Sequence, residues 1–229
     1  MKNLKKLSLL AASALLAVAF LAAGCGSDSA SSGSSSKNTT VTVGATPVPH
    51  GEILNEIKPL LAKEGVDLKV VEFTDYVKPN LALNDKELDA NFFQHSPYLD
   101  KFNSEHGTKL KAIAKIHVEP MGIYSHKIKD LKDLPDGAKV AIPNDPTNGG
   151  RALLILQSAG LIGLKDGGNI TSTVQDVEKN DKHLQFVELE AAQIPRSIDD
   201  VDIALINTNF AMEAGLNPLK DALFLEPKD

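Results

Sequence analysis

The sequence predicts an α/β fold built as two lobes with a ligand cleft between them. Short apolar runs rich in β-branched residues alternate along the chain with stretches whose apolar residues recur at helical spacing. The 229 residues, 42% apolar and 24% charged, have the composition of a globular protein and suffice for two small lobes. A collagen-like, wholly disordered or polytopic membrane protein is therefore excluded.

The first lobe is predicted to begin with a strand, a helix and a second strand. Residues 41–45 form the first expected strand, and Pro47 marks the turn that follows it. Apolar residues at helical spacing predict a helix over 51–64, which Gly65 ends. The second strand is expected at 66–73, and a unit of this order favours parallel pairing of its strands.

The remaining elements are divided between the two lobes. For the first lobe we expect helices at 77–83 and 96–105 and strands at 88–92, 110–117 and 121–125. For the second lobe we expect strands at 139–143, 184–189 and 201–206 and a helix that ends at 160. Lobe 1 then comprises 41–124, with 207–229 returning to it, and lobe 2 comprises 125–206. Ligands of such folds bind outside the carboxyl ends of the strands, here between the lobes.

The N-terminal segment is typical of a lipoprotein signal. Three lysines precede the apolar run 7–23, which is shorter than the roughly 20 residues that a membrane-spanning helix needs. Small residues then lead to Cys25, as in a bacterial lipobox. We therefore predict a signal peptide over 1–24 and lipidation of Cys25. The serine-rich residues 25–40 are expected to form a flexible tether.

Cysteine count and charge exclude further classes of protein. Cys25 is the only cysteine, so no disulfide can form within the chain. Acidic residues outnumber Lys plus Arg by 30 to 24, which gives a net charge of -6. Because nucleic-acid binders carry a basic surface, we expect no nucleic-acid partner.

The loop before Arg151 is the strongest candidate for a binding loop. Thr147 or Asn148 is expected to cap the next helix, and Gly149 and Gly150 would let the backbone approach a ligand closely. Free N–H groups at a helix start favour an anion, and Arg151 adds a planar fork of donors. A carboxylate fits both features. The alternative is a capped helix whose Arg151 pairs with a surface acid.

Aromatic residues are scarce in this chain but gather at 92–98. Phe93, His95 and Tyr98 would line one side of an apolar slot, against which a thioether would pack well. Tyr76, which precedes a predicted helix, could add another ring. The alternative is that phenylalanines of this segment belong to the core.

Asn207 and Asn209 follow the predicted strand 201–206. An amide oxygen accepts a hydrogen bond from an ammonium group without adding a charge, although Asn-Thr-Asn is equally common in turns. An anion site, an aromatic slot and an ammonium acceptor together describe an apolar amino acid as the ligand.

Enzyme motifs are missing from the sequence. It contains no Gly-x-Ser-x-Gly elbow, no His-Glu-x-x-His pair and no phosphate-binding glycine loop, so we predict a protein that is not an enzyme and has no cofactor. The six histidines are dispersed, and no metal site is expected. A metal site built from His50, His117 or His126 with an acid is the alternative from another class of function.

Several of these motifs, in this order, resemble the NlpA/MetQ family of methionine-binding lipoproteins, which serve ABC importers. The resemblance runs from Cys25 to the last residues of the chain. It implies a two-lobed fold of the periplasmic-binding-protein type II and a lipid anchor on the extracytoplasmic face of the cell membrane. The motifs that carry it are the lipobox and the segments 45–52, 76–80, 92–98, 144–153 and 206–209.

The resemblance also implies roles for individual residues. The carboxylate-binding arginine of the family matches Arg151, and the asparagine that faces the amino group of the ligand matches Asn207. Other ligand contacts are implied for Tyr76, Phe93, His95, Tyr98 and Asn148.

The function implied by the resemblance is delivery of methionine, with the L form preferred, to a membrane permease powered by an ATPase subunit. The alternatives are a receptor for a methionine-containing dipeptide, for D-methionine or for another amino acid, and a metal-binding lipoprotein. Family members usually continue for several dozen residues beyond a segment like the one that ends at Glu226. We therefore expect this chain to be short at its C-terminus.

Overall fold

A computed structural model describes residues 39–227 of the chain. The predicted signal peptide, Cys25 and all but the last two residues of the predicted tether lie outside the described residues. Those last two residues, Thr39 and Thr40, belong to the first strand rather than to a tether.

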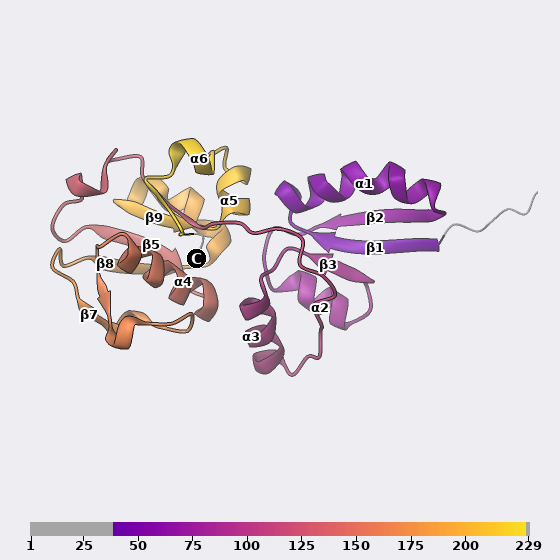
Figure 1. Ribbon diagram of the computed structural model, residues 1–229, viewed down its shortest axis with the longest axis horizontal. Helices are drawn as coiled ribbons and strands as arrows, with labels where there is room; N and C mark the ends of the chain where they lie inside the picture. Colours follow the sequence, from indigo (N-terminus) through magenta and orange to yellow (C-terminus); the bar gives the residue numbers. More distant parts are fainter. Residues whose placement is uncertain (1–38, 228–229) are drawn as a thin grey trace, which may run out of the picture. The chain divides into compact units, whose positions relative to one another are not determined.

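The first sheet has three strands in the order β2-β1-β3 (Figure 1). Strand β1 (Thr39–Ala45) pairs in parallel with β2 (Val66–Glu72), and helix α1 (Glu52–Lys63) connects them. This confirms the predicted β-α-β unit. Strand β3 (Ala90–Phe92) pairs in parallel with the other side of β1.

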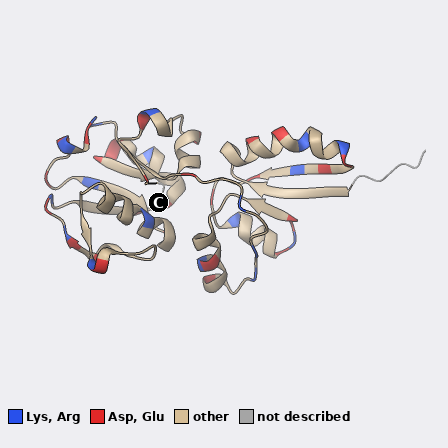
Figure 2. Ribbon diagram, in the orientation of Figure 1, with Lys and Arg blue, Asp and Glu red and all other residues tan. Residues whose placement is uncertain are grey.

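Two further helices follow the strands of the first sheet. Helix α2 (Lys78–Asn84) leads to β3, and α3 (Ser96–His106) follows it. A π-helical turn, η1 (Pro47–Gly51), links β1 to α1. The acidic residues of α1 lie in its first half and the lysines in its second half (Figure 2). Its one buried residue, Leu54, packs in a core with Val43 and Leu68 of the sheet. The predicted apolar face is buried only in part, because Ile57 and Leu60 are 37% and 58% exposed.

The second sheet has five strands in the order β10-β4-β9-β5-β8. Strand β5 pairs in parallel with β8 and β9, whereas β4 pairs antiparallel with β9 and β10. The strands are β4 (Gly122–Tyr124), β5 (Lys139–Pro143), β8 (Gln185–Leu189), β9 (Ile203–Ile206) and β10 (Phe224–Leu225).

Two apolar cores cover the faces of the second sheet. One core contains α4 (Pro146–Ser158), whose Leu153 and Leu156 pack against β5 and β9, and the other contains α5 (Thr208–Glu213). Smaller elements surround them: the β-ladder β6 (Gly163–Leu164) with β7 (Val177–Lys179), the 3-10 helix η5 (Ala191–Asp200) and α6 (Pro218–Asp221).

The predicted strand at 110–117 is wrong. In the structure, residues 108–121 connect the two sheets without helix or strand. A strand needs a neighbour to receive its backbone hydrogen bonds, and β-branched residues alone do not supply one. Ile113 and Val118 of this crossover segment are 91% and 90% exposed, so their side chains found no core among the described residues either.

The lobe boundaries differ from those expected. Residues 122–124 and 224–225 were assigned to the first lobe, whereas β4 and β10 both belong to the second sheet. The reason is pairing: Ile123 lies opposite both Leu205 of β9 and Phe224 of β10. Among the described residues, no helix is long and apolar enough to cross a membrane.

Candidate functional site

The predicted aromatic residues form one cluster. The ring centroids of Tyr76 and Phe93 are 5.7 Å apart, and those of Tyr76 and Tyr98 are 5.8 Å apart. His95 lies parallel to Tyr98 at 6.3 Å. The structure therefore brings together all four aromatic residues predicted for the site. Phe93 is also buried, so the alternative that a phenylalanine of this segment belongs to the core holds for it in part, and Tyr98 is buried as well.

Phe210 is a member of this cluster that sequence reasoning missed. Its ring centroid lies 4.8 Å from that of Tyr76, and its side chain is buried on α5. The Tyr76 hydroxyl donates to Asn209 Oδ1, at 2.5 Å, and Tyr98 donates to the Tyr76 carbonyl. These contacts join α3 and the segment before α2 to α5. In the sequence, the one indication of these contacts was that Phe210 directly follows Asn207 and Asn209, which were predicted to lie near the ligand.

His95 is the polar member of the cluster. Its Nε2 atom is buried and has no hydrogen-bond partner among the described residues. Burial, and then the nearby charge of Arg151, lower the pKa of His95 to about 4. The ring is therefore neutral at physiological pH, and Nε2 is free to donate to or accept from a ligand, depending on the tautomer.

Asn148 and Asn207 are joined in a chain of hydrogen bonds that begins at Asp145. The amide nitrogen Nδ2 of Asn148 donates to both carboxylate oxygens of Asp145, each at 3.0 Å. Because an ionised carboxylate only accepts, Asn148 must turn its oxygen the other way. That oxygen accepts from Asn207 Nδ2 at 2.9 Å.

This chain of bonds fixes which end of the Asn207 amide is available. Its nitrogen faces Asn148, and its oxygen Oδ1 is buried without a partner among residues 39–227. Leaving such an acceptor unpaired costs free energy, which a donor from a ligand would recover. Asn148 was predicted to contact the ligand; in the structure its side chain holds the amide of Asn207 in place.

Arg151 lies one turn further along α4, and its guanidinium already has partners. Its Nε donates to Glu226 Oε1 at 2.7 Å, and its Nη2 donates to Glu226 Oε2 and to the Glu119 carbonyl. Within the described part of the chain, Nη1 makes no further bond, so its two N–H groups remain open to a ligand. The Glu226 side chain is 24% exposed, so the structure shows the pairing of Arg151 with an acid that was the alternative for this loop. Neither Glu119 nor Glu226 was identified from the sequence.

One local prediction about the loop before Arg151 is wrong, and the structure gives its glycines a role in packing. The side chain that caps α4 is Asp145, which accepts from the backbone N–H of Asn148, and not Thr147 or Asn148. The glycines serve packing: a Cβ at Gly150 would lie 2.2 Å from the carbonyl oxygen of Ile170. At Gly150 the close approach is therefore between the backbone of α4 and the backbone at Ile170. The Asp145 carboxylate accepts from the Asn148 N–H, which is one of the N–H groups that were expected to bind an anion.

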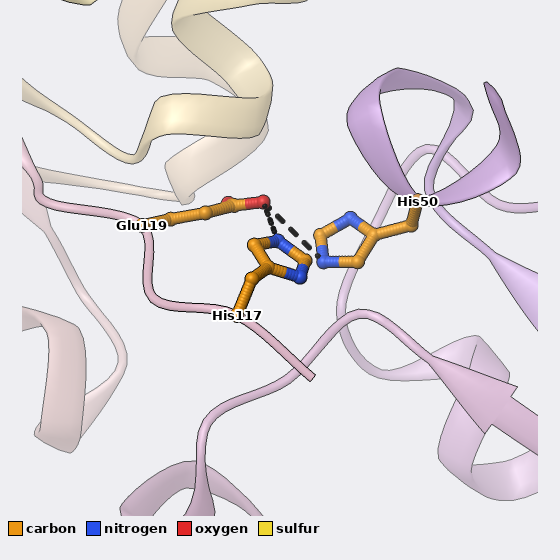
Figure 3. A group of neighbouring side chains, drawn as sticks. All are labelled: His50, His117 and Glu119. Carbon is orange, nitrogen blue, oxygen red and sulfur yellow. Dashed lines mark hydrogen bonds and ion pairs between the residues drawn. The ribbon is translucent and has the colours of Figure 1, made fainter. Parts of the chain in front are cut away.

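Two histidines far apart in the sequence meet at a carboxylate. His50 Nε2 lies 3.5 Å and His117 Nε2 lies 2.7 Å from Glu119 Oε1 (Figure 3). The ligand atoms of the three residues all lie within 4.8 Å of one another. His126, the third histidine considered for a metal site, pairs instead with the exposed Asp199. The grouping depends on the crossover segment, whose course the sequence did not reveal.

Comparison with known proteins relates the whole described chain to one family. Residues 41–229 match the family of NlpA lipoproteins. A relative from Salmonella typhi, named D-methionine-binding lipoprotein MetQ, is 52% identical over 178 residues, which are 76% of this chain and 66% of the relative. The chain thus spans slightly less than two thirds of that relative's length.

Solved structures agree with the fold. A lipoprotein from Ruminococcus gnavus superposes with a TM-score of 0.82 at 48% identity, over 83% of this chain and 79% of that one. A nutrient-binding protein from Burkholderia cenocepacia, solved with bound methionine, has a TM-score of 0.77 at 48% identity, over 82% and 80% of the two chains. These similarities confirm the predicted two-lobed α/β fold of the periplasmic-binding-protein type.

Proposed function

The chain belongs to the NlpA lipoprotein family, and from this premise we propose that it is a substrate-binding protein that holds methionine for an ABC importer. The relative from Salmonella typhi is named for D-methionine, and the Burkholderia cenocepacia structure contains methionine. Both names agree with the chemistry of the cluster around Asn207 and Arg151. We propose L-methionine as the preferred form.

The observation that carries this proposal is that the buried Oδ1 of Asn207 has no hydrogen-bond partner among residues 39–227. An α-amino acid presents an ammonium group with three donors, and an oriented amide oxygen accepts one of them without introducing another charge. The asparagine is 8% exposed, so the bond would form away from water, where it is stronger.

The other two parts of the ligand have matching partners nearby. The open Nη1 group of Arg151 offers two charged donors to a carboxylate, while Glu226 holds the guanidinium from the opposite side. The rings of Tyr76, Phe93 and Tyr98 offer polarizable faces to a thioether. Carboxylate, ammonium and thioether are the three groups of methionine.

The same proposal covers anchoring and partners. Cleavage before Cys25 and lipidation of its thiol would keep the protein on the extracytoplasmic face of the cell membrane, where tethering raises its concentration near a permease. Import would then be driven by the ATPase of that permease. A receptor of this kind binds and releases its ligand unchanged, so we propose no catalytic activity.

Calorimetric titration tests the proposal. The protein is unfolded and refolded to remove carried ligand and is then titrated with L-methionine, D-methionine, leucine and glycyl-methionine. L-methionine should bind most tightly. Arg151→Lys keeps the positive charge but loses the planar fork, and each lost charged hydrogen bond, about 1.5–3 kcal/mol, should weaken binding about tenfold or more.

Arg196 supplies the matched control, because it is the other arginine of the chain and is exposed on η5. Arg196→Lys should bind as the wild type does. If both variants lose affinity for L-methionine equally, or if Arg151→Lys loses none, Arg151 does not bind the ligand. If folded protein binds only the dipeptide or only D-methionine, the ligand assignment fails while the family assignment stands.

A further inference from the structure

Two imidazole nitrogens converge on one carboxylate oxygen at the junction of the crossover segment with the first sheet. His50 comes from the turn η1 after β1, whereas His117 and Glu119 come from the crossover segment. Figure 3 shows both Nε2 atoms directed at the same oxygen, Glu119 Oε1, at 3.5 and 2.7 Å. Two acceptor-capable nitrogens and a carboxylate thus surround one small volume.

The spacing suits a first-row divalent ion. Zinc takes imidazole nitrogen and carboxylate oxygen at about 2.0–2.2 Å, so tetrahedral ligand atoms lie about 3.3–3.6 Å from one another. The three ligand atoms here are already within 4.8 Å of one another, which small side-chain rotations would bring to that geometry. Two histidines with one glutamate is a known set of protein ligands for zinc, whereas calcium and magnesium prefer oxygen.

Neighbouring groups hold His50 as a metal ligand requires. Its other nitrogen, Nδ1, lies 2.7 Å from the Thr46 hydroxyl, which is fully buried. When Nδ1–H donates to Thr46, the lone pair of Nε2 points at Glu119. Phe92 contacts both imidazoles edge-on, with ring centroids 4.6 Å from His50 and 5.4 Å from His117, which restricts both rings.

Burial and exposure agree with this arrangement. The side chains of His50 and Glu119 are 5% and 20% exposed, and a cation would compensate for the cost of burying the carboxylate. The His117 side chain is 28% exposed, which gives an ion a path from solvent and leaves a position for water.

We propose that His50, His117 and Glu119 form a binding site for a zinc-like divalent ion, separate from the amino-acid site. Binding would replace the direct contact between His117 Nε2 and Glu119 Oε1. The ion would join the crossover segment to the turn after β1. Because the Glu119 carbonyl accepts a hydrogen bond from Arg151, the ion would also fix the position of the part of the crossover segment that this arginine contacts.

Calorimetric titration of chelator-treated full chain with Zn²⁺, Mg²⁺ and Ca²⁺ tests the site. We expect one Zn²⁺ per chain, a higher melting temperature with Zn²⁺, and no comparable binding of Mg²⁺ or Ca²⁺. His117→Gln, at the exposed ligand, should weaken Zn²⁺ binding about tenfold or more without unfolding the protein. Glu119→Gln should weaken binding similarly, and Co²⁺ should give the visible spectrum of a tetrahedral site.

His183 supplies the matched control. It also lies 2.7 Å from a carboxylate, that of Asp136, but both residues are exposed and the pair has no third ligand within the described residues. His183→Gln should leave Zn²⁺ binding unchanged. The proposal is overturned if folded wild-type protein does not bind one Zn²⁺, or if His117→Gln binds as tightly as the wild type. The three residues would then be a hydrogen-bonded brace only.

Discussion

The orientation of Asn207 leads to a prediction about one functional group of the ligand. Asp145 and Asn148 hold its amide so that Oδ1 has no hydrogen-bond partner among the described residues. Asn207→Ala removes this acceptor. A hydrogen bond between a buried acceptor and a charged donor contributes about 1.5–3 kcal/mol, so methionine binding should weaken about 30-fold, the equivalent of about 2 kcal/mol.

The assay compares two ligands on each variant. 4-(Methylthio)butanoate keeps the carboxylate and thioether of methionine but lacks the ammonium group. Asn207→Ala should therefore lower the affinity for methionine and leave that for the analogue within about threefold. Asn148→Ala, which frees the Asn207 amide to turn, should show the same selectivity with a smaller loss. The ratio of the two affinities does not depend on the fraction of protein that is folded.

Asn84→Ala is the control for the loss of an amide, since Asn84 is exposed on α2 and its side chain, within the described residues, bonds only to Asp85. It should not change either affinity. The reasoning is refuted if Asn207→Ala weakens both ligands equally, because the amide would then support the fold of the site rather than the ammonium group.

Two further predictions concern stability. The pKa of His95 is about 4 in the folded protein and 6.5 when unperturbed, so the unfolded state binds more protons between these values and stability falls as pH drops below 6.5. Between pH 7 and pH 5, the free energy of unfolding measured in urea should fall by about 2 kcal/mol less for His95→Phe than for the wild type. An equal fall in both proteins would contradict the argument from the burial of His95. Gly150→Ala should lower the free energy of unfolding by about 1–3 kcal/mol, because its Cβ would lie 2.2 Å from the Ile170 carbonyl oxygen. The control is Ser158→Ala, on the exposed side of α4, which should leave the free energy of unfolding unchanged. If Gly150→Ala is as stable as the wild type in the same urea assay, the segment around Ile170 can move away from the new Cβ without a loss of free energy.

Local patterns predicted the elements that depend on neighbours in the sequence. The strand at 139–143 was predicted with its observed bounds, because an apolar run between turn residues specifies a buried strand. The helix that carries Arg151 was also predicted, but its cap was not. Thr147 and Asn148 are good capping residues, yet Asp145 takes that position and leaves Asn148 free to bond with Asn207.

Contacts between distant residues were beyond the reach of sequence patterns. Glu226 meets Arg151 only because β10 pairs with β4, and a strand of two residues carries almost no periodic signal. The crossover segment brings Glu119 to His50 through a path that contains no regular element. Local propensity does not encode such paths, which follow from the packing of the whole fold.

The most direct test of the account is a crystal structure with selenomethionine as the ligand, in which anomalous scattering locates the selenium atom. We predict one selenium peak among the rings of Tyr76, Phe93 and Tyr98, with the carboxylate at Arg151 and the ammonium group at Asn207. A selenium peak away from these rings, or a ligand whose ammonium group does not meet the Asn207 amide oxygen, would contradict the account.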